Sequence, residues 1–470
     1  MSRDDQRAKS SSGAGDNEHS RSARMARGKL LRQTVARSDH RVWKPEADRP
    51  DPVTLIEATN AGRLAEFIPI RHGRMVQSVF AFLRGSAVVM AADLSRTPVT
   101  GIRAQVCGDC HLLNFGTFIG PDGNMLFDIN DFDESLPAPW EWDIKRLTAS
   151  FVVAARHIGL SDHNARDASR ACVRSYRERM CEFAEMRVLD VWNTRHEVGE
   201  FISQYSKKKG DSLQGDDLGI ATIDPRHVAD TIPKLAKKVN GKWKIADKPP
   251  LIFHPNQAQG FANEVPQFLR LYLQSLQEDR RALLERYRLA DWALKVVGVG
   301  SVGLRCAVAL FEAGEDDPLV LQFKEARPSV LEPYVGKSAY SNHGQRVVTG
   351  QRMMQSVSDN FLGWSRAEAH GLDFYFRQLR GLKGSITPEK MSAARLIEYA
   401  KICGWVLSRS HAKTSDAAMI SGYLGQGDAF DQALADFAIA YADQTEQDYD
   451  AFKQAVASGR IAAVSESSGD

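Results

Sequence analysis

The stretch QVCGDCHLLNFG, about a quarter of the way along the chain, constrains the fold more than any other part of the sequence. Its residues match the patterns of three kinds of site, and each kind requires a different fold around it. Cys107, Cys110 and His111 form the CxxCH pattern that attaches a c-type haem. The two cysteines could also begin a zinc site, but no further pair of Cys or His ligands follows at a suitable spacing. Asp109 and Asn114 form a third pattern, D-x-x-x-x-N, which places a carboxylate and an amide in one loop.

Composition narrows the classes of protein. A chain of 470 residues is long enough for two or three lobes, and 43% hydrophobic with 26% charged residues is typical of a globular protein. The net charge of +2 gives no general electrostatic reason to bind nucleic acid or an anionic membrane. No long apolar run predicts a membrane span, and the N-terminus lacks the apolar core of a secretory signal. We therefore expect a cytoplasmic protein, which disfavours covalent haem.

The acidic residues after this stretch suit phosphoryl transfer. That reaction needs one carboxylate to orient the attacking hydroxyl and oxygen ligands to hold Mg²⁺ on the phosphates. Asp109 has the position of the first group, and Asn114 with Asp131, at the end of the strand-like MLFDIN, has that of the metal ligands. Asp128 and Asp133 compete with Asp131. Strand alternation puts Asp128 and Asp131 on opposite faces, so only one can easily share the metal with Asn114.

A second constellation contains Gly298, Gly300, Ser301 and Gly303, followed by Lys324. Glycines allow backbone N–H groups to approach phosphates without a Cβ obstruction. In a kinase-like small lobe the glycine loop joins two antiparallel strands, and a lysine on the next strand reaches the phosphates of ATP.

The same glycines also fit a Rossmann unit. In that case a helix follows the loop over residues 304–313, and an acid such as Glu325 holds a ribose. Periodicity does not decide between the two interpretations. The loop at Asp109 favours a nucleoside triphosphate as the ligand, because hydride transfer does not require a loop with a base and metal ligands.

The pattern along the chain predicts five segments. They are a disordered tail at residues 1–40, a large-lobe segment with the catalytic and metal loops at 41–290, a β-rich nucleotide-binding small lobe at 291–385, a helical segment completing the large lobe at 386–458 and a frayed tail at 459–470.

Several longer stretches resemble an uncharacterised bacterial family catalogued as domain of unknown function 2252. They are RPDPVTLIEATN, IPIRHGRMVQSVFAFLRGSAVVMAADL, CGDCHLLNFG, FDINDFDES, PWEWDIKRL, KEARPSVLEPYVGKS, GQRVVTGQRMMQ and FYFRQLRGLKGS. The resemblance runs from about residue 40 to about residue 455. It implies a protein-kinase-like fold and no established substrate.

A narrower resemblance links the loop to aminoglycoside-type phosphotransferases. Gly108-Asp109-Cys110-His111-Leu-Leu-Asn114 resembles their G-D-x-H-x-x-N loop, which implies that Asp109 is catalytic. By the same resemblance Asp131 is the metal-binding aspartate, and Asp143 is the aspartate that supports the catalytic loop. Cys107 departs from the pattern, because such kinases usually carry a histidine there.

The order of the motifs is inverted relative to an ordinary kinase, because the loop at Asp109 precedes the glycines and Lys324. A circular permutation would reconcile this order, since a fold depends on contacts and termini often lie close together. The helix ending CGWVLSRSHA, near His411, resembles the one that normally leads into the catalytic loop. The permutation predicts that Lys324 faces Asp131 across a cleft.

The sequence therefore predicts an α+β, protein-kinase-like two-lobed fold in circularly permuted order, with a mainly helical large lobe and a smaller antiparallel sheet. It would use ATP and Mg²⁺ to phosphorylate a hydroxyl of a small molecule. Glu332 is the expected partner of Lys324, with Glu325 second. Arg71 and Arg74 could touch phosphates, although lone arginines are more often surface ion-pair partners. Two alternatives remain, a catalytically silent kinase-like nucleotide-binding protein and a Rossmann-type NAD(P)-dependent oxidoreductase.

Overall fold

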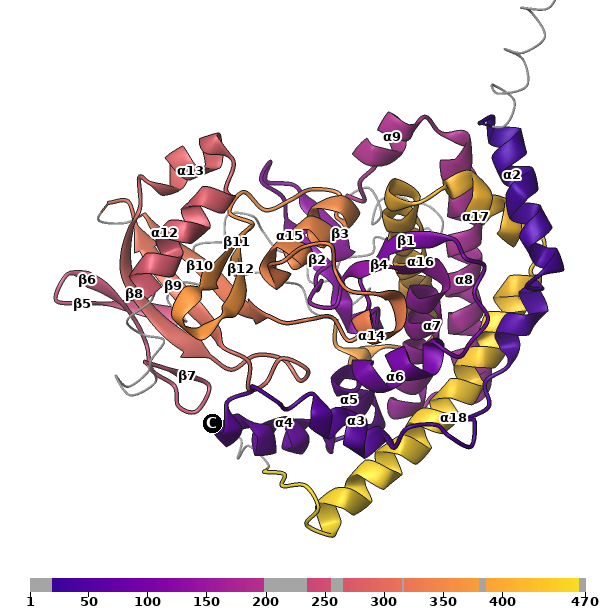
Figure 1. Ribbon diagram of the computed structural model, residues 1–470, viewed down its shortest axis with the longest axis horizontal. Coiled ribbons are helices and arrows are strands. Elements are labelled where there is room, and N and C mark those ends of the chain that lie inside the picture. Colours follow the sequence, from indigo (N-terminus) through magenta and orange to yellow (C-terminus); the bar gives the residue numbers. More distant parts are fainter. Residues whose placement is uncertain (1–18, 198–234, 255–264, 315–316, 380–385, 465–470) are drawn as a thin grey trace, which may run out of the picture.

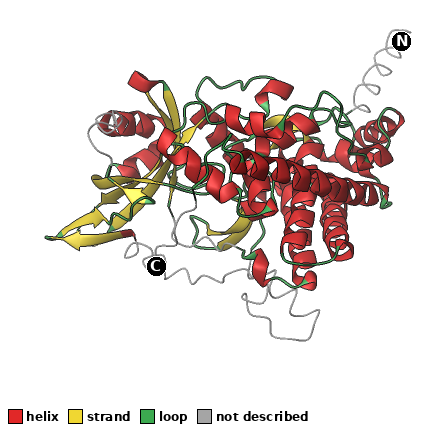
Figure 2. Ribbon diagram, turned by 90° about the horizontal axis from the view of Figure 1, so that it is seen from below, coloured by secondary structure: helices red, strands yellow, loops and turns green. Residues whose placement is uncertain are grey.

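A β-sheet and a helical bundle form the two ends of the molecule, and two short two-stranded sheets lie between them (Figure 1). The computed structural model describes residues 19–197, 235–254, 265–314, 317–379 and 386–464. Figure 2 shows the same division from below, with most strands on one side and most helices on the other. The α+β class is therefore confirmed.

Helices account for most of the bundle end and also cover the sheet. They are α2 (Arg21–Leu30), α3 (Pro52–Ala58), α4 (Ile68–Met75), α5 (Val79–Gly85), α6 (Ala87–Leu94), α7 (Trp140–His157), α8 (Asp162–Glu185), α9 (Val188–Asn193), α12 (Val265–Ser275), α13 (Glu278–Leu284), α14 (Glu332–Val335), α15 (His343–Met354), α16 (Ala393–Thr414), α17 (Ala417–Leu424) and α18 (Ala429–Ala457). None of the helices within the described ranges combines the length and the apolar character needed to cross a bilayer.

Within the described residues, the strands form one large sheet and three two-stranded ones. They are β1 (Arg103–Val106), β2 (Phe115–Ile119), β3 (Met125–Ile129), β4 (Leu136–Pro139), β5 (Ala236–Val239), β6 (Lys242–Ile245), β7 (Ile252–Phe253), β8 (Arg288–Lys295), β9 (Cys306–Glu312), β10 (Pro318–Ala326), β11 (Gly363–Ala367) and β12 (Leu372–Gln378). The large sheet has six strands in the order β11-β12-β10-β9-β8-β7, and every neighbouring pair is antiparallel. The small sheets pair β1 with β4, β2 with β3 and β5 with β6.

The bundle is built around α7, α8 and α16. Helix α16 begins where the side chain of Ser392 caps the backbone N–H of Arg395. It then crosses α8 at Gly404, where a Cβ would lie 2.2 Å from the carbonyl oxygen of Cys172. Only glycine permits this approach, and it lets buried side chains of both helices join one hydrophobic core. A short 3₁₀ helix, Pro388–Lys390, precedes α16.

The sheet is covered by α12 through aromatic packing. Phe268 of α12 contacts Phe323 edge-to-face with ring centroids 5.1 Å apart, and Tyr272 stacks on Phe376 at 4.0 Å. Phe323 projects from β10 and Phe376 from β12 toward the helix. The hydrophobic core that they form with α12 fixes β10, the strand that carries Lys324.

The chain after the glycine motif is a strand rather than a helix. Residues 304–313, which a Rossmann unit would make helical, contain β9, and β9 pairs antiparallel with both β8 and β10. The glycines therefore join two antiparallel strands of one sheet. The small lobe also begins earlier than residue 291, because β7 and the start of β8 belong to its sheet. Residues 380–385, its predicted end, lie outside the described residues.

The prediction of a disordered tail over residues 1–40 is wrong for its second half, and residues 1–18 lie outside the described part. Helix α2 packs against α17 through two glycines. A Cβ on Gly28 would lie 2.0 Å from Met419 O, and one on Gly422 would lie 2.1 Å from Met25 O. The polar composition concealed this contact, because it is made by backbone rather than by apolar side chains.

The predicted fraying over residues 459–470 is wrong for the described residues 459–464. Ile461 is buried, and the backbone N–H of Val464 donates to Pro69 O at 2.9 Å. A Cβ on Gly73 would lie 1.9 Å from Val464 O, so this segment also packs backbone against backbone on α4.

Candidate functional site

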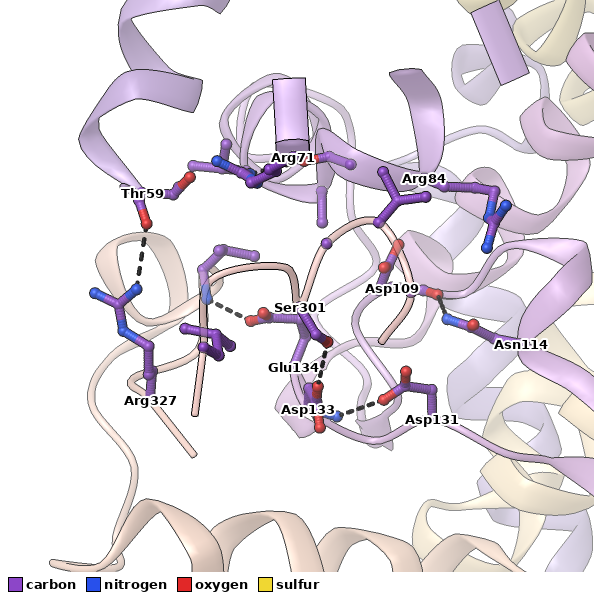
Figure 3. Close-up of a pocket in the computed structure, with 18 of the residues that line it drawn as sticks. Thr59, Arg71, Arg84, Asp109, Asn114, Asp131, Asp133, Glu134, Ser301 and Arg327 are labelled. Atoms are coloured by element: carbon purple, nitrogen blue, oxygen red, sulfur yellow. Dashed lines mark hydrogen bonds between the residues drawn. The ribbon is translucent and has the colours of Figure 1, made fainter. Parts of the chain in front are cut away.

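A cavity of about 300 Å³ brings together most of the predicted site residues. Six of them line it: Asp109, Asn114, Asp131, Gly298, Gly300 and Ser301. Figure 3 shows the carboxylates of Asp131 and Asp133 near Ser301, with Asp109 beside Asn114. The volume is at the lower end of the range for small-molecule sites. Gly303, Lys324 and Glu332 are not among the lining residues.

The loop that carries Asp109 is held from below by Asp143. This aspartate, in the first turn of α7, accepts hydrogen bonds from the backbone N–H groups of Cys107 at 2.8 Å and Gly108 at 3.0 Å. Gly108 has φ +80°, and a Cβ there would lie 2.5 Å from Glu134 O, so glycine is required. The loop-supporting role implied for Asp143 thus matches its hydrogen bonds.

Hydrogen bonds from Arg146 and Asn114 help to fix Asp109 in place. Nε of Arg146 donates to its carboxylate at 2.6 Å, and Nδ2 of Asn114 donates to its backbone oxygen at 2.6 Å. The Arg146 side chain is 2% exposed and is itself anchored to Leu83 O at 2.9 Å. The Asp109 side chain keeps 23% exposure, so it is both oriented and open to the cavity. These contacts do not use the side-chain amide oxygen of Asn114.

Lys324 meets the acidic end of the cavity through Asp133. Its Nζ forms an ion pair with Oδ2 of Asp133, and Tyr375 donates its hydroxyl to Oδ1 of the same carboxylate at 2.7 Å. Ser301 Oγ of the glycine loop also donates to Asp133, at 3.4 Å. Lys324 itself is 3% exposed and lies behind the cavity wall.

The charges around Asp131 favour its ionised form. Burial by itself would raise the pKa of Asp131, but the cations of Lys324 and Arg377 outweigh burial, and this pKa lies below its usual value. Burial would likewise lower the pKa of Lys324, but Asp131 and Asp133 hold it well above its usual value. Both charges are thus kept in a place from which water is largely excluded.

Asp128 and Asp131 have different environments. Asp128 is fully buried, pairs with Arg409 at 2.7 Å and accepts the backbone N–H and the hydroxyl of Ser356, each at 2.8 Å. Asp131 lines the cavity, and its one hydrogen bond to the part of the chain that the structure describes comes from the backbone N–H of Asp133, at 3.3 Å. Of the two, Asp131 is the carboxylate that a metal ion in the cavity could reach.

Glu332 does not have the position predicted for it. It lies in α14, where its carboxylate is 3.9 Å from Nδ1 of His343. Within the described ranges, the carboxylate paired with Lys324 is that of Asp133. Glu325 lines the cavity but pairs with Arg305 at 3.0 Å, because neighbouring residues on β10 point to opposite faces.

The turn of residues 298–303, called the glycine turn below, is held by the segment before α4. Gly298 and Gly303 have φ +66° and +84°, values that favour glycine. Leu64 N donates to Gly303 O at 2.8 Å, and Arg63 donates to Val302 O at 2.5 Å. Gly298 and Gly300 line the cavity, whereas Gly303 packs on Arg63 behind it.

The cavity also contains four arginines, Arg63, Arg71, Arg84 and Arg327. Sequence reasoning named Arg71 as a weak candidate and missed the other three. Arg71 is 2% exposed, so it is no surface residue. No spacing rule links two short helices near residues 70–85 to a strand end near residue 327, so the sequence held no signal for this group.

His111 of the same loop is a neutral base inside the protein. It is 4% exposed, its Nδ1 has no hydrogen-bond partner among the described residues, and burial lowers its pKa to about 3. Its Nε2 is 3.9 Å from Oδ2 of Asp109.

Acidification is therefore expected to destabilise the fold through His111. In the unfolded chain a histidine takes up a proton near pH 6.5, whereas folded His111 does so only near pH 3. Below pH 6.5 the unfolded state binds the extra proton, and by pH 5 this histidine should lower the free energy of unfolding by about 2 kcal/mol. Urea unfolding at pH 7 and pH 5 should show a smaller loss in His111→Gln. His163→Gln, at an 81% exposed histidine, should keep the full loss.

The surroundings of Cys107 and Cys110 bear on the haem and zinc alternatives. Cys107 and Cys110 are buried in the main hydrophobic core, and a haem bonded to both would displace that packing. Ligand atoms of Cys107, Cys110 and Asp143 lie within 4.8 Å of one another. A structural zinc takes four ligands, and this group, within the described part of the chain, has three. Both oxygens of Asp143 are also used by the loop backbone.

Comparison with known proteins gives the family. The chain belongs to the family described as uncharacterized protein conserved in bacteria (DUF2252), whose family model matches residues 63–455. No curated protein and no solved structure matches the chain. The family predicted from the motifs is confirmed, and its kinase-like character stays a prediction.

Proposed function

We propose that this member of the bacterial family is an ATP- and Mg²⁺-dependent phosphotransferase. It transfers the γ-phosphoryl group to a hydroxyl of a small molecule and has a kinase-like fold in circularly permuted order. One observation carries the proposal. Asp109, Asn114 and Asp131 line the same cavity as the glycine turn, which comes about 170 residues later, and Lys324 is ion-paired at its acidic end.

The arrangement around the glycine turn supports the nucleotide assignment. The turn joins β8 to β9, and Lys324 stands on the next strand, β10, which is the order of these parts in kinases. Gly298 has open space on the side where a Cβ would stand, so backbone N–H groups can approach phosphates there. When the nucleotide binds, Lys324 would give up part of its contact with Asp133 and would neutralise charge on a phosphate instead.

The donor set at the acidic end suits Mg²⁺. Magnesium prefers oxygen ligands and usually takes one or two carboxylates together with substrate phosphates. The carboxylate of Asp131 and the amide oxygen of Asn114 offer such ligands, and both line the cavity. When bound, the ion would neutralise charge on the phosphates. Asp133, held by Lys324 and Tyr375, would remain the neighbouring anion.

Asp109 would orient the acceptor hydroxyl and accept its proton. Kinases use an aspartate of a D-x-x-x-x-N loop for this step. The contact with Arg146 fixes the direction of the carboxylate, and α7 with Asp143 fixes the loop that carries it. Rigid positioning of this kind is what phosphoryl transfer demands of the protein.

The contacts between α16 and β1 support the permuted order. Gln105 N donates to Thr414 Oγ1 at 3.2 Å, and Ser415 Oγ donates to Arg103 O at 2.8 Å. Nε2 of His411 is 3.5 Å from the loop-supporting Asp143. The end of α16 thus meets the strand that enters the catalytic loop, although more than 300 residues separate them in the sequence.

Thermal unfolding with nucleotides tests the proposal. Mg²⁺ with ATP should raise the melting temperature, since a ligand at about 100 times its Kd adds about 2.7 kcal/mol of stability. ATP with a chelator should raise it much less. Asp131→Asn should lose most of the Mg²⁺-dependent part, measured relative to the melting temperature of the unliganded variant. Asp122→Asn, on the exposed β2–β3 turn, is the matched control and should respond like the wild type.

Two results would count against this function. Stabilisation by NAD or NADP but not by Mg²⁺-ATP would favour an oxidoreductase. Mg²⁺-ATP binding without any consumption of ATP across a panel of hydroxyl compounds would favour a silent nucleotide-binding protein.

A further inference from the structure

Four arginines line the cavity, and three of them converge on residues 59 and 60: Arg63 and Arg327 both donate to Thr59 O, and Arg71 donates to Asn60. Arg84 lies nearer to Asp109. Arg71 and Arg84 come from α4 and α5, Arg63 from the segment between α3 and α4, and Arg327 from the end of β10. In Figure 3, Arg71 and Arg84 lie on one side of the cavity, and Asp131 and Asp133 lie on the other. We call these four arginines the arginine cluster.

The carboxylates of the cavity neutralise this cluster only in part, because most of them pair with other cations and one, Glu325, lies 4.0 Å from Nε of Arg327. Asp109 pairs with Arg146, Asp133 with Lys324 and Glu325 with Arg305. Glu134 accepts the backbone N–H of Val330 at 2.7 Å, and burial raises its pKa. Asp131 is balanced by Lys324 and Arg377.

The arginines bond mainly to neutral oxygens. Arg63 donates to Thr59 O at 3.0 Å, and Arg71 donates to Asn60 Oδ1 at 2.6 Å and to Gly85 O at 3.2 Å. Among the residues that the structure describes, Arg63, Arg71 and Arg84 form no ion pair. Nε of Arg71 and Nε of Arg84 are buried and have no hydrogen-bond partner in that same set.

The cluster therefore has an excess of positive charge, which nearby carboxylates offset only in part. Burial, then repulsion from Arg327, lowers the pKa of Arg63 to about 10. Burial, then repulsion from Arg63 and Arg327, holds the pKa of Arg71 well below its usual value. A guanidinium remains charged nonetheless, and a buried charge without a counter-ion is costly to the fold. A bound anion would remove this cost.

We infer that the arginine cluster binds a phosphate group of the acceptor, so that the substrate is a phosphorylated small molecule with a free hydroxyl. Guanidinium groups bind phosphate through paired hydrogen bonds, and several together suit a dianion. The claim that this phosphate belongs to the acceptor rests on the proposed function, whereas the anion site itself does not depend on that function. In the reaction, the hydroxyl oxygen bonds to the γ-phosphorus, the bond from that phosphorus to ADP breaks, and Asp109 takes the proton.

Titration calorimetry with inorganic phosphate tests the site on the full chain, with potassium chloride added to keep the ionic strength constant. Arg84→Gln is the main variant, because Arg84 is only half-buried and its Nε has no hydrogen-bond partner among the described residues. It should weaken phosphate binding at least about tenfold, the effect of losing a charge-assisted hydrogen bond. Arg187→Gln, at an 84% exposed arginine of the bundle end, should bind like the wild type.

A second titration separates the two possible sources of the phosphate. It repeats the measurement at saturating Mg²⁺ with a non-hydrolysable ATP analogue. Phosphate that still binds, and still depends on Arg84, has a place beside the nucleotide and supports the acceptor assignment. Phosphate that the analogue displaces would mean that the cluster holds the phosphates of the nucleotide, which overturns that assignment.

The first titration can also overturn the site itself. Equal phosphate affinity in the wild type and Arg84→Gln, or no phosphate binding at all, would exclude an anion site at the cluster. Failure of the ATP analogue to bind, with Arg84-dependent phosphate binding intact, would remove the phosphotransferase and leave the anion site. The two proposals therefore fail in different measurements.

Discussion

Asp109→Asn is expected to lower the turnover of Mg²⁺-ATP by about 10²–10⁴-fold, the usual contribution of a positioned general base. An amide has nearly the same shape as the carboxylate and can still accept the hydrogen bond from Arg146. It cannot take a proton from the acceptor. Nucleotide affinity should therefore change little, because Asn114, Asp131 and the glycine turn are untouched.

The measurement compares ATP consumption and calorimetric ATP binding in the same preparations. Asp122→Asn, on the neighbouring hairpin, removes a carboxylate from the surface and should alter neither. Turnover of Asp109→Asn within a few-fold of the wild type would exclude Asp109 as the base. Loss of binding and turnover together would mean that Asp109 serves the nucleotide or the fold rather than the proton transfer.

Asp128→Asn is expected to lower the free energy of unfolding by about 3–5 kcal/mol, the cost of removing one partner from a buried ion pair. Asp128 and Arg409 both have side chains with 0% exposure. Two nitrogens of Arg409 already lack hydrogen-bond partners among the described residues, so its charge depends strongly on this carboxylate. Chemical denaturation at pH 7 measures the loss.

A double variant distinguishes lost charge balance from lost packing. Asp128→Leu with Arg409→Met replaces both charges by apolar groups, and such exchanges of buried pairs are often neutral. The double variant should therefore be more stable than either single one. If Asp128→Asn lowered the free energy of unfolding by less than about 1 kcal/mol, the ion pair would not stabilise the fold as its burial implies.

Local patterns predicted the parts of the site that lie within one segment. The strand-like MLFDIN, which ends near Asp131, is present as β3, because short-range periodicity specifies it. Asp143 was assigned through the resemblance to aminoglycoside-type phosphotransferases, and its hydrogen bonds to the backbone of Cys107 and Gly108 agree with that role. The glycine turn could not be decided, since a strand such as CAVALFE and a buried helix share the same apolar composition.

Contacts between distant segments were beyond sequence reasoning. Asp133 pairs with Lys324 across 191 positions, and nothing in the sequence ranks it above Glu332. The arginine cluster is a product of the same long-range packing. The tails were misjudged for another reason: Gly28 and Gly73 allow backbone to pack on backbone, which no hydrophobic pattern records.

The cavity has a practical consequence for dissecting this protein. Its lining comes from three stretches, around residues 59–88, 107–134 and 298–330, with the sheet and the bundle supplying the supports. A fragment of residues 59–330 would keep all three but would lose β11, β12 and α16, which belong to those supports. Shortened clones can report on folding of their own part, but only the uninterrupted polypeptide can report on chemistry.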